Sequence, residues 1–141
     1  MPVSTAIAVA AALLVVATVL GLVLRTGDGR RRAGRGLAVR AEDLPAPLAT
    51  GATLVQFSTA LCARCPQVRR MLTGIAEADP AVTHLDIDLT HRNDLAARYH
   101  VLQTPTIFLV DRTGAVVSRW SGVPERTAVV SALRAVTKTA P

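Results

Sequence analysis

A run of 22 residues without a charged side chain, from Val3 to Leu24, restricts the fold of this chain more than any other feature of its sequence. A helix of about 20 apolar residues spans the hydrocarbon core of a bilayer. The rest of the chain is too small to enclose such a helix in a soluble core. A signal peptide is the other alternative, but it carries basic residues before an apolar stretch of only about 7–15 residues. The sequence therefore predicts an uncleaved transmembrane anchor over residues 1–24, in contact with membrane lipid through residues 3–24.

The next segment, residues 25–43, is basic and rich in glycine. It holds six of the 16 basic residues against three acids, and thus half of the net charge of +6. It has no apolar periodicity, which predicts a flexible linker. The positive-inside rule then favours a cytoplasmic position for the rest of the chain, with the basic residues near anionic lipid. Stacking aromatic residues are absent from the segment, so we expect no nucleic-acid partner.

Residues 44–141 form the predicted folded domain, in which apolar runs alternate with helical periodicities. Strands are expected at residues 53–57, 82–87, 106–110 and 116–120, and helices at residues 68–76, 92–99 and 124–136. The last two strands are typical of a hairpin, with Gly114 in the turn. The element order β-α-β-α-β-β-α predicts an α/β domain, a central mixed sheet flanked by helices on both faces.

The only two cysteines, Cys62 and Cys65, lie between the first expected strand and the first expected helix. The N-terminus of a helix presents unpaired N–H groups and the positive end of the helix dipole, and both favour a thiolate. Arg64 adds a positive charge beside them. The thiolate is the attacking species in disulfide exchange, and a second thiol one turn away can resolve the mixed disulfide. The motif predicts dithiol–disulfide exchange, with Cys62 as the more exposed nucleophile and Cys65 as the resolving thiol.

Two other interpretations of the cysteine pair remain open. The thiols could be structural, which the strand–CxxC–helix context disfavours. They could also hold a zinc or copper ion together with a histidine and deliver it to a membrane partner. The three candidates, His84, His91 and His100, form no recognisable ligand pair. We therefore expect neither a metal site nor a cofactor other than the redox-active cysteine pair itself.

From Leu54 to about Val136 the chain resembles the thioredoxin superfamily. Besides the two cysteines, the resemblance rests on the runs Leu85-Asp-Ile-Asp88 and Thr104-Pro105-Thr106, and on Gly114 and Gly122. It implies a thioredoxin-like fold in which Pro105 is cis beside the active site and presents the Thr104 backbone to an extended substrate. It also implies two kinds of partner, namely protein dithiol or disulfide substrates and a protein that donates or accepts electrons.

The chain departs from the family pattern around the cysteines. Leu61 replaces the usual Trp, and Ala63-Arg64 replaces Gly-Pro. Gln56 stands where the family has a buried Asp that assists the resolving thiol, and His84 stands at the position of a family lysine. Gln56 cannot take up a proton, whereas a histidine titrates near neutrality. His84 is therefore a candidate proton acceptor for Cys65, and a strand histidine without a role is the alternative.

Together these features predict a single-pass membrane protein that acts as a thiol–disulfide oxidoreductase. A metal-binding or metal-delivery module of the same fold is the alternative. Tethered members of the superfamily commonly face outward, which opposes the cytoplasmic position that the charges favour.

Overall fold

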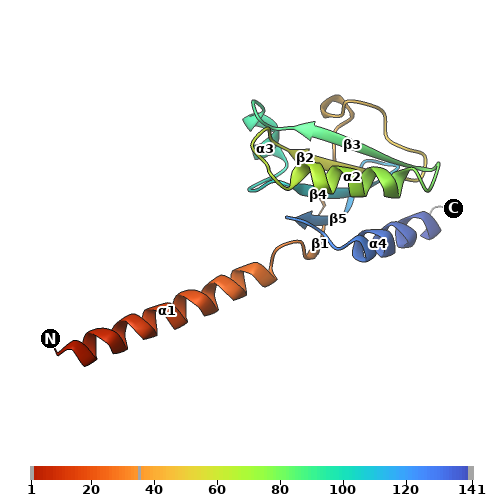
Figure 1. The fold of residues 1–141 in the computed structure, drawn as a ribbon. Helices are drawn as coiled ribbons and strands as arrows, with labels where there is room; N and C mark the ends of the chain where they lie inside the picture. The colour runs from red at the N-terminus through yellow and green to blue at the C-terminus, as the bar shows by residue number, and fades with distance from the viewer. Residues whose placement is uncertain (1, 35, 140–141) are drawn as a thin grey trace.

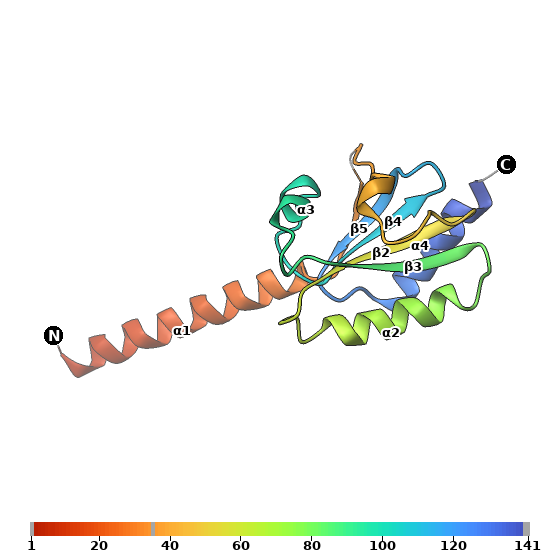
Figure 2. The same ribbon diagram turned by 90° about the horizontal axis from the view of Figure 1, so that it is seen from above.

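The structure is a computed structural model that describes residues 2–34 and 36–139. Its N-terminal helix, α1 (Val3–Thr26), extends away from the rest of the chain, and all of its side chains are exposed (Figures 1 and 2). Exposure of so many Val and Leu side chains is unfavourable in water. By length and composition α1 can cross a membrane, a property that it shares with signal sequences.

Within the described residues, five strands form one mixed sheet with the order β1-β5-β4-β2-β3. The strands are β1 (Arg31–Ala33), β2 (Ala52–Ser58), β3 (Val82–Asp88), β4 (Thr106–Asp111) and β5 (Val116–Ser121). β2 and β3 are parallel, and the other pairs are antiparallel. The helices of the domain are α2 (Cys65–Ala76), α3 (Asn93–Arg98) and α4 (Arg126–Thr139). The expected mixed sheet flanked by helices is confirmed, and the bounds of every expected element lie within three residues of those observed.

β2 runs through the centre of the sheet and is buried along its whole length. Its alternating side chains serve two apolar clusters. Leu54 packs in the cluster that α2 and α4 cover, whereas Val55 and Phe57 pack in the cluster that α3 covers. Figure 2 shows α2 and α3 on opposite sides of the sheet. The C-terminal end of β2 is thus held firmly from both faces at the point where the cysteine loop begins.

The segment 25–43 was expected to be a flexible linker, but its described residues include a strand of the sheet and a short helix. β1 pairs antiparallel with β5 and is an edge strand of the sheet. A short 3-10 helix, η1 (Ala41–Asp43), follows it. The composition of β1 hid this strand from sequence analysis, because Arg-Arg-Ala lacks the apolar alternation of a half-buried strand and all three side chains are exposed.

Two glycines of this segment, Gly29 and Gly34, permit close packing. The N–H of Gly29 donates to the carbonyl oxygen of Ser121 at 2.6 Å. A Cβ on Gly29 would lie 2.1 Å from the carbonyl oxygen of Val123, and one on Gly34 would lie 1.6 Å from that of Val116. The interpretation of these glycines as a source of flexibility is therefore corrected, because here they let one backbone approach another.

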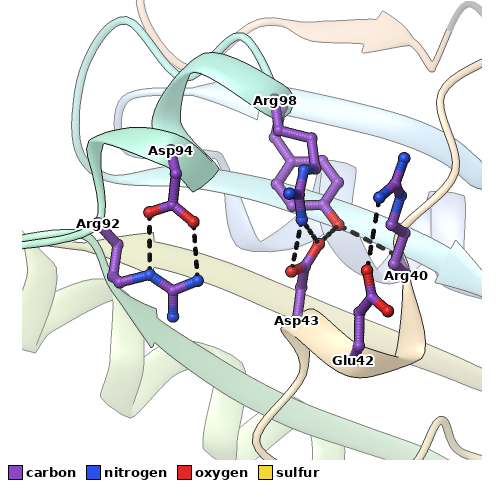
Figure 3. A network of polar contacts seen from close by, with 7 residues as sticks. Arg40, Glu42, Asp43, Arg92, Asp94 and Arg98 are labelled. Atoms are coloured by element: carbon purple, nitrogen blue, oxygen red, sulfur yellow. Dashed lines mark hydrogen bonds and ion pairs between the residues drawn. The ribbon is translucent and has the colours of Figure 1, made fainter.

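Figure 3 shows how η1 is held against α3. The Asp43 carboxylate accepts hydrogen bonds from Arg98 Nη1 at 2.7 and 2.8 Å and a short one from the Tyr99 hydroxyl. That hydroxyl accepts the N–H of Arg40 at 3.1 Å. Burial would raise the pKa of Asp43, but these hydrogen bonds and the nearby arginine charges outweigh it and hold the pKa below its usual value. The network fastens the N-terminal segment to the domain.

Candidate active site

The two cysteines lie where the chain passes from β2 to α2. β2 ends at Ser58 and α2 begins at Cys65, so the loop between them holds Cys62. The two cysteines form a disulfide, with their Cα atoms 5.4 Å apart. Cys65 is only 2% exposed, whereas Cys62 is half-buried. The motif therefore lies between a strand and a helix, as expected, and Cys62 is the more accessible of the pair.

The start of α2 suits a thiolate. Pro66 occupies its first turn, where the missing N–H removes no helical hydrogen bond. The other N–H groups of that turn and the helix dipole present partial positive charge toward the cysteines. Arg64, immediately before the helix, adds a full positive charge on a side chain that is 61% exposed.

The loop that precedes β4 borders the same site. The peptide bond between Thr104 and Pro105 is cis, as the resemblance to thioredoxins implies. The carbonyl oxygen of Pro105 accepts the N–H of Gly122 at 2.7 Å, and the Thr104 hydroxyl lies 3.3 Å from the hydroxyl of Thr59. Since Thr59 belongs to the cysteine loop, its contact with Thr104 holds the two loops beside each other.

A cleft of about 1250 Å³ opens in front of the cysteines. Its walls come from the cysteine loop, from the loop around Pro105, and from the segment that joins the last turns of α1 to β1. Cys62 lines the cleft and Cys65 does not. A partner that enters the cleft therefore meets Cys62 first.

Asp28 reaches into this cleft from the segment after α1. Its carboxylate accepts a hydrogen bond from Arg64 Nη1 at 2.9 Å and one from Gln103 Nε2 at 3.2 Å. Gly122 has a φ of +91°, and a Cβ there would lie 1.7 Å from Asp28 Oδ1, so only glycine leaves room for the carboxylate. Sequence analysis missed Asp28, whose only signal is an acid between two glycines in a basic segment.

Gln56 lies beside the resolving cysteine. It is fully buried in β2, and its Nε2 donates to the backbone oxygen of Cys65 at 3.0 Å. Its Oε1 is buried without a hydrogen-bond partner among the described residues. The structure thus brings Gln56 to Cys65, as the resemblance implies, and leaves an unpaired acceptor atom there.

A carboxylate lies on the strand next to Gln56. In the parallel register of β2 and β3, the partner of Gln56 is Asp86. Ser58 Oγ donates to one oxygen of Asp86 at 2.6 Å, and Arg69 Nε donates to the other at 2.6 Å. Sequence analysis did not single out Asp86. Its signal was its place two residues after His84, on the same face of the strand.

The structure places His84 beside the last turns of α2. Its Nδ1 lies 3.1 Å from the hydroxyl oxygen of Thr73, which follows Cys65 by eight residues in α2, about 12 Å along the helix axis. Burial lowers the pKa of His84; the charge of Asp86 opposes this change, and that of Arg69 adds to it. A proton passing between His84 and Cys65 needs an intermediate group.

Within residues 2–34 and 36–139, no three His, Cys, Asp or Glu side chains lie together in a way that could hold a metal ion. Cys62 and Cys65 are joined to each other. Of the candidate histidines, His84 packs against Thr73 and His100 lines the cleft. The donor groups of this part of the chain therefore give no support to the metal-delivery alternative.

Comparisons with known proteins agree with the fold. The Thioredoxin family model matches residues 41–135. A mutant thioredoxin from Halobacterium salinarum NRC-1 has 24% identity and a TM-score of 0.57, with 65% of this chain and 80% of that one covered. Fasciola hepatica thioredoxin has 20% identity and a TM-score of 0.53, with 85% and 93% covered. Oxidised mitochondrial thioredoxin 3 from Saccharomyces cerevisiae has 22% identity and a TM-score of 0.53, with 61% and 79% covered.

At these identities the solved structures establish the fold alone, and the chain matches no curated protein sequence. The family model, in contrast, covers more than half of the chain and includes both cysteines and Pro105. The disulfide at the start of α2 supplies the chemistry that the fold by itself does not establish. The chain therefore belongs to the thioredoxin family, and its Cys62–Cys65 pair is that of a thiol–disulfide oxidoreductase.

Proposed function

We propose that this protein is a membrane-tethered thiol–disulfide oxidoreductase in which Cys62 attacks the partner and Cys65 resolves the mixed disulfide. The observation that carries the assignment of roles is the difference in access between the two residues. Cys62 lines the cleft beside Pro105, whereas Cys65 is 2% exposed. A partner protein can approach the first residue but not the second.

In the reducing direction, the Cys62 thiolate attacks one sulfur of a partner disulfide. The partner's S–S bond breaks, a mixed disulfide forms, and the released partner thiolate takes up a proton. The Cys65 thiolate then attacks the Cys62 sulfur and releases the second partner thiolate. Two electrons and two protons pass from the protein dithiol to the partner, and the protein is left with the disulfide that the structure contains. The reverse sequence oxidises a partner dithiol.

The groups around the cysteines support this sequence of steps. Arg64 and the first turn of α2 favour the Cys62 thiolate. We expect the Thr104 backbone, beside cis-Pro105, to bind an extended partner segment. Gln56 hydrogen-bonds the backbone of Cys65 and positions it. The partners that we propose are protein disulfides or dithiols and a protein that exchanges electrons with the pair, and the cysteine pair carries the electrons without a cofactor.

We infer that α1 is the tether. Its apolar side chains are all exposed, and its length suits a bilayer. Basic residues lie in its last turn and after its C-terminal end, namely Arg25, Arg30, Arg31 and Arg32. The positive-inside rule therefore supports a cytoplasmic domain.

Trapping of partners tests the roles of the cysteines. In cells, Cys65→Ser should accumulate disulfide-linked complexes that dissolve on reduction, because nothing resolves them. Cys62→Ser should accumulate none, because the remaining thiol is buried. Equal capture by the two variants would contradict the assignment.

Two further measurements test the tether and its orientation. The protein should stay in the membrane fraction after alkaline carbonate extraction, and a protein released by it would contradict the anchor. After dithiothreitol has reduced the trapped complexes in intact cells, a membrane-impermeant maleimide should leave Cys62 of the Cys65→Ser variant unlabelled until the membrane is permeabilised. Labelling before permeabilisation would overturn the cytoplasmic position and leave the enzyme assignment intact.

A further inference from the structure

The end of α1 and the mouth of the active site lie on the same side of the domain. Val23 and Leu24, in the last turns of α1, line the same cleft as Cys62. Figure 2 shows the C-terminal end of α1 beside the start of α2. A membrane that contains α1 therefore lies next to the catalytic end of the sheet.

The connection between α1 and the domain is short and fixed. Only Gly27 and Asp28 separate the end of α1 at Thr26 from Gly29, whose N–H is bonded to Ser121. Two residues span at most about 7 Å. Asp28 is itself held by hydrogen bonds to side chains that line the cleft. The domain is thus held with Cys62 toward the bilayer surface and has no free linker on which to turn away.

The mouth of the cleft carries exposed apolar side chains. Leu61 is 97% exposed and Leu102 is 94% exposed, and both line the cleft with Cys62. Among the described residues outside α1, Leu61 and Leu102 are the large apolar residues whose side chains are exposed. Exposed apolar side chains that line the same cleft indicate a surface for contact with a partner. Leu61 directly precedes the attacking cysteine, so a partner that reaches Cys62 covers it.

The charges around the cleft match a bilayer surface. The lining includes five arginines and one acid, Asp28; the arginines are Arg25, Arg30, Arg32, Arg64 and Arg119. Such a set of positive charges suits the layer of anionic lipid headgroups. The leucines and the arginines together favour a partner segment that is apolar and lies at the edge of a membrane.

We propose that the substrate of this enzyme is a disulfide or dithiol of a membrane-embedded protein, at the boundary between hydrocarbon and water. This inference rests on the proposed function, namely the tether and the attack by Cys62. The apolar residues that flank the substrate cysteine contact Leu61 and Leu102, and the short connection holds the two reacting sulfurs at the same depth. The electron transfer is the exchange given above, in which a partner disulfide oxidises the dithiol or a partner dithiol reduces the disulfide.

The test uses the full-length Cys65→Ser protein in vesicles of phosphatidylcholine and phosphatidylglycerol. Two synthetic single-span peptides each carry one cysteine as a mixed disulfide with thiopyridine, one at the bilayer boundary and the other at the end of a hydrophilic Gly/Ser stalk. Attack by Cys62 forms a protein–peptide disulfide and releases the thiopyridine thiol. We expect the boundary peptide to react at least about tenfold faster than the stalk peptide, because its effective concentration at Cys62 is higher.

A second chain carries a Gly/Ser spacer of about 20 residues between Thr26 and Gly27, which spans about 25 Å. The spacer should bring the ratio of the two rates close to one. The matched control carries the same spacer after Pro141 and should keep the original ratio. Leu102→Ser should lower the ratio several-fold, because the boundary segment loses an apolar contact.

Equal rates for the two peptides without a spacer, or a ratio that the spacer between Thr26 and Gly27 leaves unchanged, would overturn the proposal. Reaction of each chain with soluble dithiodipyridine separates this outcome from a failure of the proposed function. A Cys62 that reacts with the soluble compound but shows no preference between the peptides removes the boundary substrate alone. A Cys62 that is inert toward all three reagents removes the enzyme assignment, and a chain that does not float with the vesicles removes the tether.

Discussion

Asp28 and Arg64, 36 residues apart in the sequence, form an ion pair across the mouth of the active site, with Arg64 Nη1 2.9 Å from Asp28 Oδ2. Arg64 lies between the two cysteines, and Asp28 follows the helix that we infer to be the tether. The contact therefore links the juxtamembrane segment to the charge beside the attacking cysteine. Because Arg64 is largely exposed, solvent weakens this ion pair. We therefore expect the ion pair to change the reactivity of Cys62 more than the stability of the domain.

Asp28→Asn should raise the reactivity of reduced Cys62. The amide oxygen can still accept a hydrogen bond from Arg64, but it no longer neutralises the guanidinium charge. A larger fraction of Cys62 is then thiolate at neutral pH. We expect the rate of alkylation by iodoacetamide to increase about threefold, the effect of roughly 0.7 kcal/mol that a partly exposed charge exerts. Asp94→Asn, which removes an exposed acid paired with Arg92, is the matched control, and an equal increase there would contradict the local effect.

Asp43→Asn should destabilise the domain. The side chain of Asp43 is 5% exposed and accepts charge-assisted hydrogen bonds from Arg98. Loss of such bonds costs about 1.5–3 kcal/mol. Chemical unfolding in detergent micelles, followed through the fluorescence of the buried Trp120, measures the change. Glu42→Gln, in which the lost carboxylate is 69% exposed, should change the unfolding free energy by less than about 0.5 kcal/mol.

The same residue predicts a pH dependence. The pKa of Asp43 is lower in the folded domain than its usual value of 3.8. Its contribution to stability is therefore fully present above the unfolded pKa and is lost as the pH falls through the folded pKa. Wild type and Asp43→Asn should differ most above about pH 4.5 and converge in stronger acid. Parallel stability curves down to strong acid would contradict this assignment.

Gln56→Asp should speed resolution by Cys65. A carboxylate beside Cys65 can accept the proton of the resolving thiol, whereas the amide cannot. We expect about tenfold faster turnover in an insulin-reduction assay. Burial raises the pKa of the new carboxyl. Relative to wild type, the variant should therefore be most stable in acid and should lose stability as the pH rises from the unfolded pKa of the new carboxyl through its folded pKa. Gln56→Asn has the same length without the charge, and an equal acceleration there would exclude proton transfer as the cause.

The apolar periodicity predicted the fold well in elements that bury one face, because burial there requires apolar residues at regular positions. Val68, Leu72 and Ile75 predict α2 because they pack against the sheet. The helix begins one turn earlier, at Cys65, where polar residues and Pro66 carry no apolar signal. β1 escaped prediction for the same reason, since it is an exposed edge strand made mainly of arginine.

The candidate site was predictable in part. Cys62, Cys65 and Pro105 carry local motifs, and Gln56 follows from the resemblance. Asp28 could not be predicted from the sequence, because its contacts with Arg64 and Gln103 join segments that lie 36 and 75 residues apart. No periodicity or motif encodes a contact of that kind.

His84 shows the limit of transferring a role by position. A lysine at this place could extend a four-carbon chain, whereas the shorter imidazole ends beside Thr73. Asp86, not His84, is the strand partner of Gln56. The position of His84 in the sequence thus indicated the face of the sheet on which it lies, and its role in proton transfer stays a prediction.

The burial of His84 nevertheless predicts a pH dependence of stability. Its pKa in the folded domain lies below the usual 6.5. Its contribution to stability is therefore present above about pH 6.5 and is lost as the pH falls through the folded pKa. Between about pH 7 and about pH 5, wild type should lose more unfolding free energy than His84→Gln, which does not titrate. His91→Gln, at an exposed position, should follow wild type, and a His84→Gln curve parallel to wild type would contradict the prediction.

The role of His84 in proton transfer has its own test. Its Nε2 and Gln56 Oε1 are both buried without partners among the described residues. The two side chains share one face of adjacent strands, and a water molecule between such atoms is a common arrangement. That water would relay the proton of the Cys65 thiol to His84, whereas Gln56, whose Nε2 donates to the backbone oxygen of Cys65, would orient the water and transfer no proton.

Because only the neutral imidazole accepts a proton, and burial lowers its pKa, the rate of turnover should fall as the pH decreases below about 6.5. His84→Ala should slow turnover several-fold and remove this acid limb from the pH–rate profile, and His91→Ala should keep it. Gln56→Asp, placed in the His84→Ala background, should restore part of the lost rate, because its carboxylate lies beside Cys65 and needs no bridge. An acid limb that persists in His84→Ala would assign the proton of Cys65 to solvent and leave His84 as a residue that packs against Thr73.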